Sequence, residues 1–202
     1  MVEAMLWDAD GVLQETPGGW VAHFRPLLGD RVEEFLEDAW DVERPTLSGD
    51  GSWLELLPTV LERWDLTENL DDVLAIWLLM EAAPDTFALL EAVRSSGVRC
   101  YLATNQDSHR GAHMHRQFDY GRRFDGCYYS HALGVAKPAP EFFGRILADL
   151  GLEPGGVLFV DDNEANVRTA REVGLLAEQW SIGDGIEGLQ KRLARHGVLA
   201  PD

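Results

Sequence analysis

Two aspartates near the N-terminus, Asp8 and Asp10, are the residues of this chain best placed to do chemistry. They directly follow the short apolar segment 4–7, whose composition predicts a buried strand. Residues two apart in a strand point to the same side, so both carboxylates should converge just past a strand end, where open α/β sheets bind ligands. Carboxylates that close repel each other unless a cation or a shared proton relieves them. Mg²⁺ suits such oxygen ligands, so the pair predicts a metal site.

Asp and Gly also form turns, and taken alone the segment 8–12 fits a strand followed by a turn equally well. A calcium-binding EF-hand loop is excluded, because that loop needs acidic residues or Asn at its first, third and fifth positions and a terminal Glu. Counted from Asp8, the corresponding later positions hold Val12 and Gly19. The choice between a turn and a site therefore depends on the rest of the chain.

A hydroxyl and an amide follow a second expected strand, and a lysine stands at the start of a later helix. Thr104 and Asn105 come after the apolar segment 98–103 and would suit phosphate oxygens, although such a pair more often forms a turn. Lys137 precedes Pro138, a residue suited to the first turn of a helix. A lysine in that position is usually a solvated surface residue, but this chain has only two lysines beside fifteen arginines.

A second acidic pair, Asp161 and Asp162, directly follows the β-type segment 156–160. Acids at the start of a helix often only complement its dipole. Adjacent carboxylates at a strand end repel each other, however, so this pair also indicates a bound cation. The two acidic pairs, the Thr-Asn pair and the lysine thus form an ordered set of four polar sites along the chain.

The expected elements explain how these side chains come together. From position 84 onward, helix and strand patterns alternate, which is typical of a parallel sheet covered by helices. The carboxyl ends of parallel strands meet at one edge, so the four polar sites should share that edge. The strands are expected at 4–7, 98–103, 126–130, 156–160 and 175–179, and the helices at 85–95, 107–117, 138–150, 163–173 and 186–195.

The segment between the first strand and the rest has a different pattern. Residues 15–84 contain no convincing strand, which predicts a core domain of residues 1–14 and 85–202 with a small all-helical cap of residues 15–84 inserted after the first strand. Because the insert directly follows Asp10, its expected place is over the strand ends, as a lid. Its amphipathic helices are expected at 31–42, 52–64 and 71–82.

Composition restricts the class of protein. Hydrophobic residues make up 46% and charged residues 26% of the 202 residues, which is ordinary for a globular protein long enough for a core domain with an insert. The formal net charge of −18 opposes binding to nucleic acid or to an anionic membrane. The longest apolar segment, 73–80, is too short to span a bilayer, and the N-terminus lacks a secretory pattern, so a cytoplasmic location is expected.

The cysteines and the clustered histidines have simpler structural interpretations. Cys100 and Cys127 are expected to be free thiols, since they lie in separate strand-like segments and no CxxC motif is present. His109, His113 and His115 lie on one expected helix, but the glutamate of an HExxH zinc motif is missing. The histidines are therefore expected on a solvated helix face.

The glycine-rich segment 183–188 and the tryptophans of the insert are set aside for similar reasons. The segment formally matches GxGxxG, but its two acids would repel a pyrophosphate, so a loop before the last helix is expected. The tryptophans are expected to form the core of the insert, with one or two of them available to line a pocket: Trp20, Trp40, Trp53, Trp64 and Trp77.

The ordered set of polar sites resembles the motifs of the haloacid dehalogenase (HAD) superfamily, in particular its phosphatase-like branch with a small helical cap. The resemblance covers nearly the whole chain and is clearest over residues 6–13, 102–106, 133–143 and 158–170. These segments look like bacterial sugar-phosphate phosphatases and the phosphatase domain of epoxide hydrolases. The resemblance implies an α/β fold, a Rossmann-like core with five parallel strands covered by helices, together with the helical cap.

The resemblance also implies a role for each polar residue. Asp8 would attack phosphorus and form an aspartyl phosphate, while Asp10 would protonate the leaving oxygen and then activate water. Thr104 and the backbone N–H of Asn105 would hold the phosphoryl oxygens. Lys137 would offset charge between Asp8 and the transferred group.

The implied cofactor is Mg²⁺, held by Asp8, the backbone carbonyl of Asp10 and Asp162, with Asp161 nearby, directly or through water. Which of the two adjacent acids is the direct ligand stays open at this stage. The expected partner is a small phosphorylated metabolite, sugar phosphates being favoured, and no nucleic acid or membrane. The expected assembly is a monomer or a homodimer.

The implied function is a Mg²⁺-dependent phosphatase, beside three alternatives. A phosphomutase would return the phosphoryl group to a second hydroxyl, and a catalytically silent module would only bind a phosphorylated ligand. Dehalogenases of the superfamily resemble this pattern but lack an acid at the position of Asp10 and need no metal. The acid at this position therefore favours phosphate esters.

Overall fold

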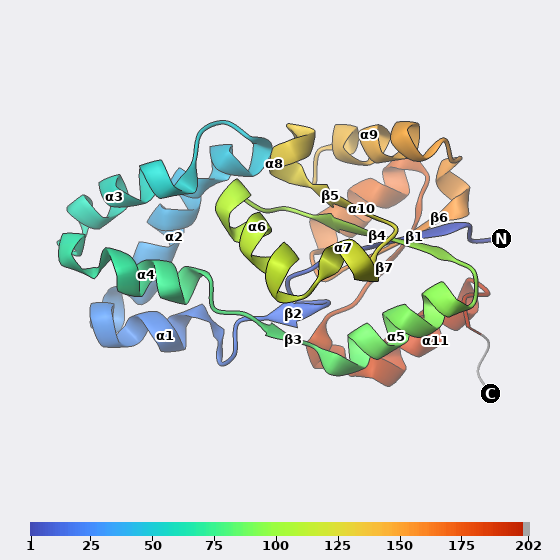
Figure 1. Cartoon of the computed structure of the whole chain (residues 1–202), viewed down its shortest axis with the longest axis horizontal. Helices are drawn as coiled ribbons and strands as arrows, with labels where there is room; N and C mark the ends of the chain where they lie inside the picture. Colours follow the sequence, from blue (N-terminus) through green and yellow to red (C-terminus); the bar gives the residue numbers. More distant parts are fainter. Residues whose placement is uncertain (200–202) are drawn as a thin grey trace.

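A five-stranded parallel sheet forms the centre of the protein, seen here in a computed structural model that describes residues 1–199. The strand order is β5-β4-β1-β6-β7, so the first strand of the chain is the central one. Figure 1 shows the sheet on the right, with helices on both of its faces. The strands are β1 (Ala4–Trp7), β4 (Arg99–Thr104), β5 (Gly126–Tyr129), β6 (Val157–Asp161) and β7 (Leu176–Gln179).

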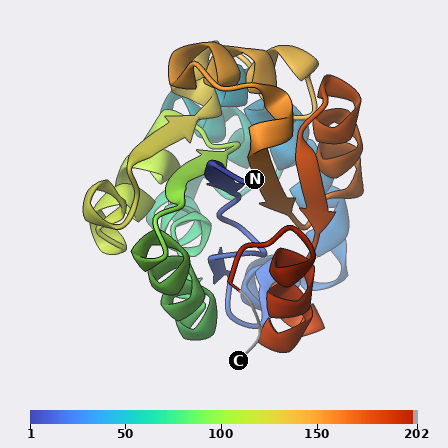
Figure 2. The ribbon, with the colours of Figure 1, turned by 90° about the vertical axis from the view of Figure 1, so that its right-hand side faces the viewer.

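Alternating side chains of the central strand build two separate apolar cores. Met5 and Trp7 point into the core below α5 (Pro84–Ser95) and α11 (Ile186–Arg195), while Ala4 and Leu6 point into the opposite core. The view along the sheet in Figure 2 shows helices on its two sides. All four residues are fully buried, as a central strand of a parallel sheet requires. The predicted α/β fold with five parallel strands is confirmed.

The remaining helices of the α/β part follow the expected alternation. Helix α9 packs against α10, and both cover the second apolar core. The 3₁₀ turn η5 leads into the last helix, as expected for the glycine-rich segment. The bounds are α6 (Ser108–Gln117), α7 (Tyr120–Arg123), α8 (Ser130–Leu133), α9 (Pro140–Leu150), α10 (Glu164–Val173), η4 (Pro154–Gly156) and η5 (Ile182–Asp184).

Four helices between β1 and β4 form a body of their own, drawn in blue to blue-green on the left of Figure 1. Their apolar faces make a third core around Phe35 and Trp53, distinct from the two cores of the sheet. Gly49 reaches back to the sheet part, where a Cβ at this position would lie 2.6 Å from the carbonyl oxygen of His131. The elements are α1 (Gly19–Leu28), η1 (Gly29–Arg31), α2 (Val32–Glu43), η2 (Arg44–Ser48), α3 (Trp53–Arg63), η3 (Thr67–Asn69) and α4 (Leu70–Trp77).

Two details of this insert differ from the sequence prediction. The expected helix 71–82 ends at Trp77, because the chain then forms β3 (Glu81–Ala82), which pairs antiparallel with β2 (Gln14–Glu15). The expectation of no strand over 15–84 is therefore wrong at its two ends. Helix α1 was not anticipated, since Gly18 and Pro26 break the pattern that indicates a helix.

Both cysteines are free thiols, as the sequence predicts. Cys100 is buried and Cys127 half-buried, and both are free. Burial raises the pKa of the Cys100 thiol to about 12 and that of Cys127 to about 11. Among the helices of residues 1–199, none has both the length and the hydropathy needed to cross a bilayer.

Candidate active site

Three neighbouring strands bring the predicted acidic residues to one edge of the sheet. Strand β1 lies between β4 and β6, and Trp7 stands in register with both Leu102 and Val160. Asp8, the first residue after β1, therefore comes level with Asp161, the last residue of β6. The predicted convergence thus follows from parallel pairing and register.

Lys137 is a buried cation held between two of these carboxylates. Its Nζ lies 2.8 Å from Oδ1 of Asp8 and 2.6 Å from Oδ2 of Asp161, and it donates to the carbonyl oxygen of Ala103 at 2.9 Å. Burial alone would lower the pKa of Lys137, but the Asp161 and Asp8 carboxylates outweigh burial and raise that pKa. The side chain of Lys137 is 1% exposed, so Lys137 is not the solvated surface residue that a lysine usually is.

Asp161 accepts hydrogen bonds at both oxygens and is completely buried. Oδ1 accepts from the backbone N–H of Asn163 at 2.8 Å and from Nδ2 of Asn166 at 3.0 Å. Oδ2 accepts from Lys137 and, at 3.1 Å, again from Asn166. These donors occupy the oxygens of Asp161, so the exposed neighbour Asp162 has more freedom to take a cation.

Asp162 lies against a glycine that follows the first acidic pair. Gly11 has φ of 75°, and a Cβ at this position would lie only 2.3 Å from Oδ2 of Asp162. A side chain at position 11 would therefore displace the carboxylate as well as strain the backbone. Gly11, which follows the first acidic pair in sequence, thus leaves the space that Asp162 of the second pair occupies.

The donor set of Asp8, Asp161 and Asp162 fits a hard divalent cation. One oxygen of each carboxylate lies within 4.8 Å of the others, and all belong to the ligand class that Mg²⁺ prefers. Burial and the Asp161 carboxylate raise the pKa of Asp8 to about 8, and the same two causes raise the pKa of Asp162. Acids whose pKa values are raised by burial and by a neighbouring carboxylate, in a cavity, are typical of functional sites.

Asp10 stands apart from this cluster and is held by an arginine. Arg110, which is 5% exposed, donates from Nη1 to Oδ2 of Asp10 at 2.6 Å and from Nη2 to Oδ1 at 3.0 Å. Gln106 and Gln14 donate to the same carboxylate at 2.6 Å and 2.9 Å. Burial would raise the pKa of Asp10, but the contacts with Arg110 lower it below the usual value.

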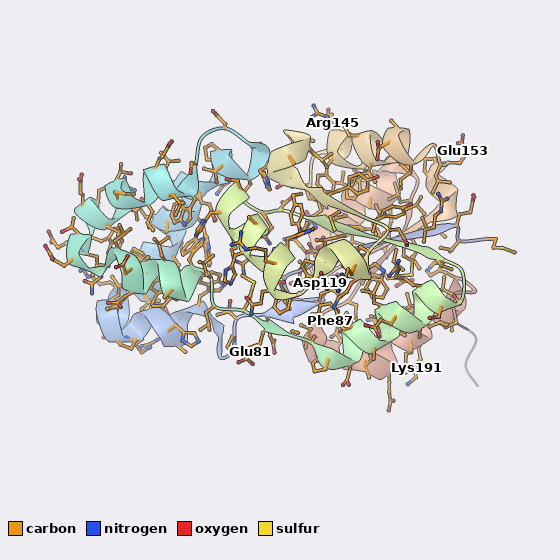
Figure 3. The ribbon with its side chains drawn as sticks, viewed as in Figure 1. Glu81, Phe87, Asp119, Arg145, Glu153 and Lys191 are labelled. Carbon is orange, nitrogen blue, oxygen red and sulfur yellow. The ribbon has the colours of Figure 1, made fainter. Side chains whose placement is uncertain are left out.

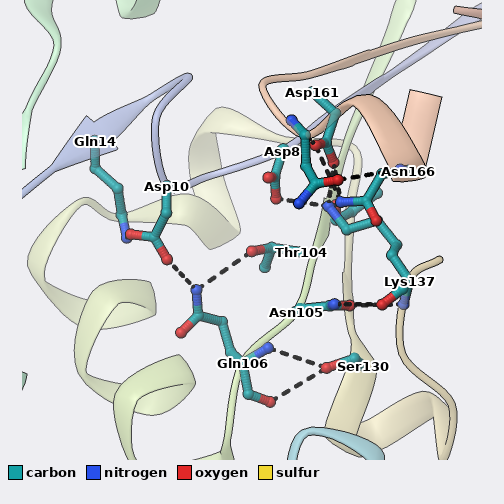
Figure 4. A network of polar contacts seen from close by, with 12 residues as sticks. Asp8, Asp10, Gln14, Thr104, Asn105, Gln106, Ser130, Lys137, Asp161 and Asn166 are labelled. Atoms are coloured by element: carbon teal, nitrogen blue, oxygen red, sulfur yellow. Dashed lines mark hydrogen bonds and ion pairs between the residues drawn. The ribbon is translucent and has the colours of Figure 1, made fainter. Parts of the chain in front are cut away.

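Figure 4 shows Thr104 between Asp10 and the group of Asp8 and Asp161, and Asn105 beside Lys137. Thr104 is 1% exposed, and its hydroxyl oxygen lies 3.4 Å from Nε2 of Gln106. The side chain of Asn105 donates to the carbonyl oxygen of Lys137 and accepts from its backbone N–H, both at 2.8 Å. The Asn105 side chain therefore fixes the loop that contains Lys137. The backbone N–H of Asn105 remains the group expected to contact a phosphate.

A cavity of about 440 Å³ connects these groups with the helical insert. Its floor includes the acidic residues, Lys137 and Thr104, and its other wall comes from the insert. A larger hollow between α5 and α11 is lined by none of these residues and has no catalytic groups of the predicted set. The insert contributes Glu15, Thr16, Gly19, Trp20, Trp40, Glu43, Leu47 and Trp77 to the cavity wall.

Several polar residues of the site were not identified from the sequence. Gln106 directly precedes Asp107, the N-cap of α6, and Arg110 lies in the first turn of that helix, so their closeness in sequence to the Thr-Asn pair was the available signal. Asn166 lies one turn after Asn163 at the start of α10 and had a similar signal. Glu43, from the distant insert, had none.

The clustered histidines remain outside the site, whereas three of the tryptophans, Trp20, Trp40 and Trp77, line its cavity. His115 contacts the hydroxyl of Tyr129 at 3.0 Å, and within residues 1–199 no three-ligand group forms around the histidines. Trp53 and Trp77 are buried in the core of the insert as expected. Trp40 is 43% exposed and lines the cavity, so the expectation that it is a core residue is wrong.

The family model of the haloacid dehalogenase-like hydrolases matches residues 2–174, and the chain belongs to this family. It is 24% identical over 208 residues to a phosphorylated carbohydrates phosphatase of Thermotoga maritima, covering 98% of this chain and 93% of that protein. Both the fold and the acidic edge of the sheet agree with a hydrolase of this family.

Solved structures show the same fold. A HAD family enzyme from Bacteroides thetaiotaomicron, in complex with magnesium and inorganic phosphate, matches with a TM-score of 0.78 and 22% identity over 94% of this chain and 99% of that one. An L-2-haloacid dehalogenase from Xanthobacter autotrophicus matches with a TM-score of 0.66 and 20% identity over 98% of this chain and 85% of that one. The fold alone therefore does not separate ester hydrolysis from dehalogenation.

Proposed function

We propose that this chain is a Mg²⁺-dependent phosphatase that hydrolyses small phosphorylated metabolites, phosphorylated carbohydrates being favoured, through an aspartyl-phosphate intermediate. The observation that carries the proposal is the pair of Asp8, held at Lys137, and a second carboxylate, Asp10, in one cavity. A dehalogenase needs only the first of these. The carbohydrate phosphatase relative, similar over nearly the whole chain, supports the substrate class.

Asp8, Asp162 and the backbone carbonyl of Asp10 are the proposed magnesium ligands. When bound, the cation would neutralise charge on the phosphoryl oxygens. We assign Asp161 to holding Lys137 and completing the acidic cluster, because its oxygens already accept four hydrogen bonds. The magnesium and phosphate bound to the Bacteroides enzyme support this part of the proposal.

In the first half of the reaction, an oxygen of Asp8 forms a bond to phosphorus and the bond from phosphorus to the ester oxygen breaks. Asp10 gives a proton to that leaving oxygen. Thr104 and the backbone N–H of Asn105 bind the phosphoryl oxygens, while the Lys137 ammonium holds the nucleophile Asp8 and offsets the charge between it and the transferred group. In the second half, Asp10 takes a proton from water, the water oxygen bonds to phosphorus, and Asp8 is released as phosphate leaves.

The contacts of Asp10 favour the second of these roles. Four donated hydrogen bonds and a lowered pKa stabilise its carboxylate form, which is the form that accepts a proton from water. For the first half, Asp10 must gain a proton and so must loosen its contacts with Arg110, Gln106 or Gln14. A movement of the proposed cap, residues 15–84, would supply this freedom, because Gln14 lies at its hinge and Arg110 contacts Trp77 of α4.

The direct test is release of inorganic phosphate from a panel of phosphorylated metabolites and 4-nitrophenyl phosphate, with and without Mg²⁺. We expect Mg²⁺-dependent release by the wild type and none by Asp8→Asn, which keeps the size of the side chain. Circular dichroism would establish that the variant is folded. Turnover by Asp8→Asn at the wild-type rate would contradict the nucleophile assignment, and a wild type inactive on every ester would contradict the function.

A further inference from the structure

The cap side of the cavity contains one buried carboxylate, Glu43, which the proposed chemistry does not use. Glu43 is the last residue of α2, is 8% exposed and lines the cavity. Its Oε1 accepts a hydrogen bond from Nε1 of Trp77 at 3.1 Å. Within residues 1–199, its Oε2 accepts no hydrogen bond. This oxygen is not among the fully enclosed polar atoms of the described residues, so it is open to the cavity and can accept a hydrogen bond from a donor of a bound molecule.

Glu43 is not explained as the counter-ion of the nearby arginine. The two terminal nitrogens of Arg110 donate hydrogen bonds to Asp10 and Gln106, and its Nε donates to the carbonyl oxygen of Trp77 at 3.1 Å. In the described part of the chain, no nitrogen of Arg110 lies within 4.0 Å of a Glu43 oxygen. If Glu43 served only as a structural ion-pair partner of Arg110, a Glu43 oxygen would be expected within 4.0 Å of an Arg110 nitrogen.

The contacts around Glu43 connect it directly with the catalytic edge. Trp77 donates to Glu43 through its indole and accepts from Arg110 through its backbone, and Arg110 in turn holds Asp10. Glu43 and Asp10 therefore line the same cavity and are connected through Arg110 and Trp77. The group attached to the ester oxygen that Asp10 protonates would share this cavity with Glu43.

Trp20 adds an aromatic surface to the cavity that Glu43 also lines. The ring of Trp20 packs 4.9 Å from that of Trp77, and the guanidinium of Arg110 lies 5.6 Å from the Trp20 ring. Trp20 is only half-buried and lines the cavity. A carboxylate beside an indole face suits a molecule that has hydroxyl donors on one side and C–H groups on the other.

We propose that Glu43 is a specificity-determining residue, whose Oε2 accepts a hydrogen bond from a hydroxyl of the leaving group while Trp20 packs against its carbon chain. The inference rests on the phosphatase function proposed above and narrows its substrates to phosphate esters of polyhydroxylated alcohols. The carboxylate selects such a leaving group over one without donors, because only the former satisfies Oε2 when the cavity is filled.

The test compares three esters: D-ribitol 5-phosphate, 4-nitrophenyl phosphate, which has no hydroxyl on its leaving group, and O-phosphoethanolamine, whose donor is an ammonium group. In Glu43→Gln, the amide oxygen can still accept from Trp77, while an NH₂ donor replaces the acceptor Oε2. We expect the ratio of kcat/KM for ribitol phosphate to that for 4-nitrophenyl phosphate to fall about tenfold to hundredfold, mostly through KM.

Glu37→Gln is the matched control, because Glu37 is an exposed glutamate of the same helix. We expect this variant to keep the wild-type ratio. Trp20→Leu is a second variant, which removes the aromatic face without altering Glu43, and should lower the same ratio. It keeps the inference testable if Glu43→Gln does not fold.

The outcomes separate the inference from the function on which it rests. A folded Glu43→Gln variant whose ratio stays within twofold of the wild-type ratio would overturn the inference, as would an equal loss on both esters. If Glu43→Gln lowered kcat/KM more for O-phosphoethanolamine than for ribitol phosphate, Glu43 would recognise a cationic group and not a hydroxyl, and the inference would also be overturned. A wild type that hydrolyses only 4-nitrophenyl phosphate would also overturn it but leave the phosphatase function intact, whereas a wild type inactive on all three esters would refute that function.

Discussion

Replacing Lys137 with methionine should destabilise the fold far more than the loss of an ordinary lysine. Methionine keeps the length of the side chain but leaves Asp161, which is fully buried, and Asp8 without their cation. The carbonyl oxygen of Ala103 also loses its donor. Removing one partner of a buried ion pair typically costs about 3–5 kcal/mol. Asn166 still donates to Asp161, so we expect about 4 kcal/mol rather than the sum of all the lost contacts.

The assay is urea unfolding of Lys137→Met and the wild type, followed by circular dichroism, in EDTA and in excess Mg²⁺. A loss of about 4 kcal/mol corresponds to a fall in melting temperature on the order of 10 °C for a domain of this size. Mg²⁺ should restore part of the loss, because the cation binds the same carboxylates in the folded state only.

The only other lysine of the chain supplies the control. Lys191 projects from α11 at the surface (Figure 3), where its side chain is 75% exposed and lies 3.8 Å from Glu187. An exposed pair of this kind contributes less than about 0.5 kcal/mol, so Lys191→Met should be nearly neutral. If Lys137→Met were no less stable than Lys191→Met, the electrostatic account of the acidic cluster would be refuted.

Three further predictions concern the groups around this cluster. Gly11→Ala, which places a methyl group against Asp162, should raise the Mg²⁺ concentration for half-maximal activity several-fold and cost about 1–2 kcal/mol of stability; unchanged Mg²⁺ dependence would contradict the close approach. Arg110→Lys keeps the charge but loses the bidentate contact with Asp10, so it should lower kcat roughly tenfold or more with little change in KM. Steady-state kinetics would measure this, and a kcat equal to that of the wild type would contradict the prediction. Burial, then the nearby Asp107 carboxylate, raises the pKa of Glu43 to about 7, so the folded protein retains this proton between about pH 4.5 and 7 and loses stability over that range. Relative to the wild type, Glu43→Gln should therefore gain up to about 3 kcal/mol between pH 4.5 and pH 8 in urea unfolding, and a constant difference would contradict the raised pKa.

The α/β part of the fold was predictable because its signals are local. The apolar segments that become β1 and β6 each end at an acidic pair, and parallel pairing then places those pairs side by side. Chain order and strand ends were therefore sufficient to bring Asp8 and Asp161 together. The sheet edge could be predicted without knowing any long-range contact except that the strands are parallel.

The polar groups that hold these residues in place depend on contacts between distant segments. Arg110 reaches Asp10 across 100 positions of sequence, and the contact between Glu43 and Trp77 joins two helices of the insert. No spacing rule connects such residues, because the first contact forms only when α6 packs beside the segment that follows β1, and the second only when α2 and α4 pack together. The short β2–β3 pair was missed for the same reason, since two residues per strand are too few to show a period.

A protein with a net charge of −18 needs a local source of positive charge to bind an anionic phosphate ester. Two buried cations, Lys137 and Arg110, face the carboxylates of Asp8, Asp161 and Asp10, and Asp162 adds a fourth negative charge. Both cations are thus already neutralised by their neighbours, and the formal charge of the edge remains negative. Neither cation alone would attract a phosphate dianion to this edge. A divalent cation at the acidic cluster would cancel the excess, so, under the proposed function, binding of the phosphorylated substrate should depend strongly on binding of the metal.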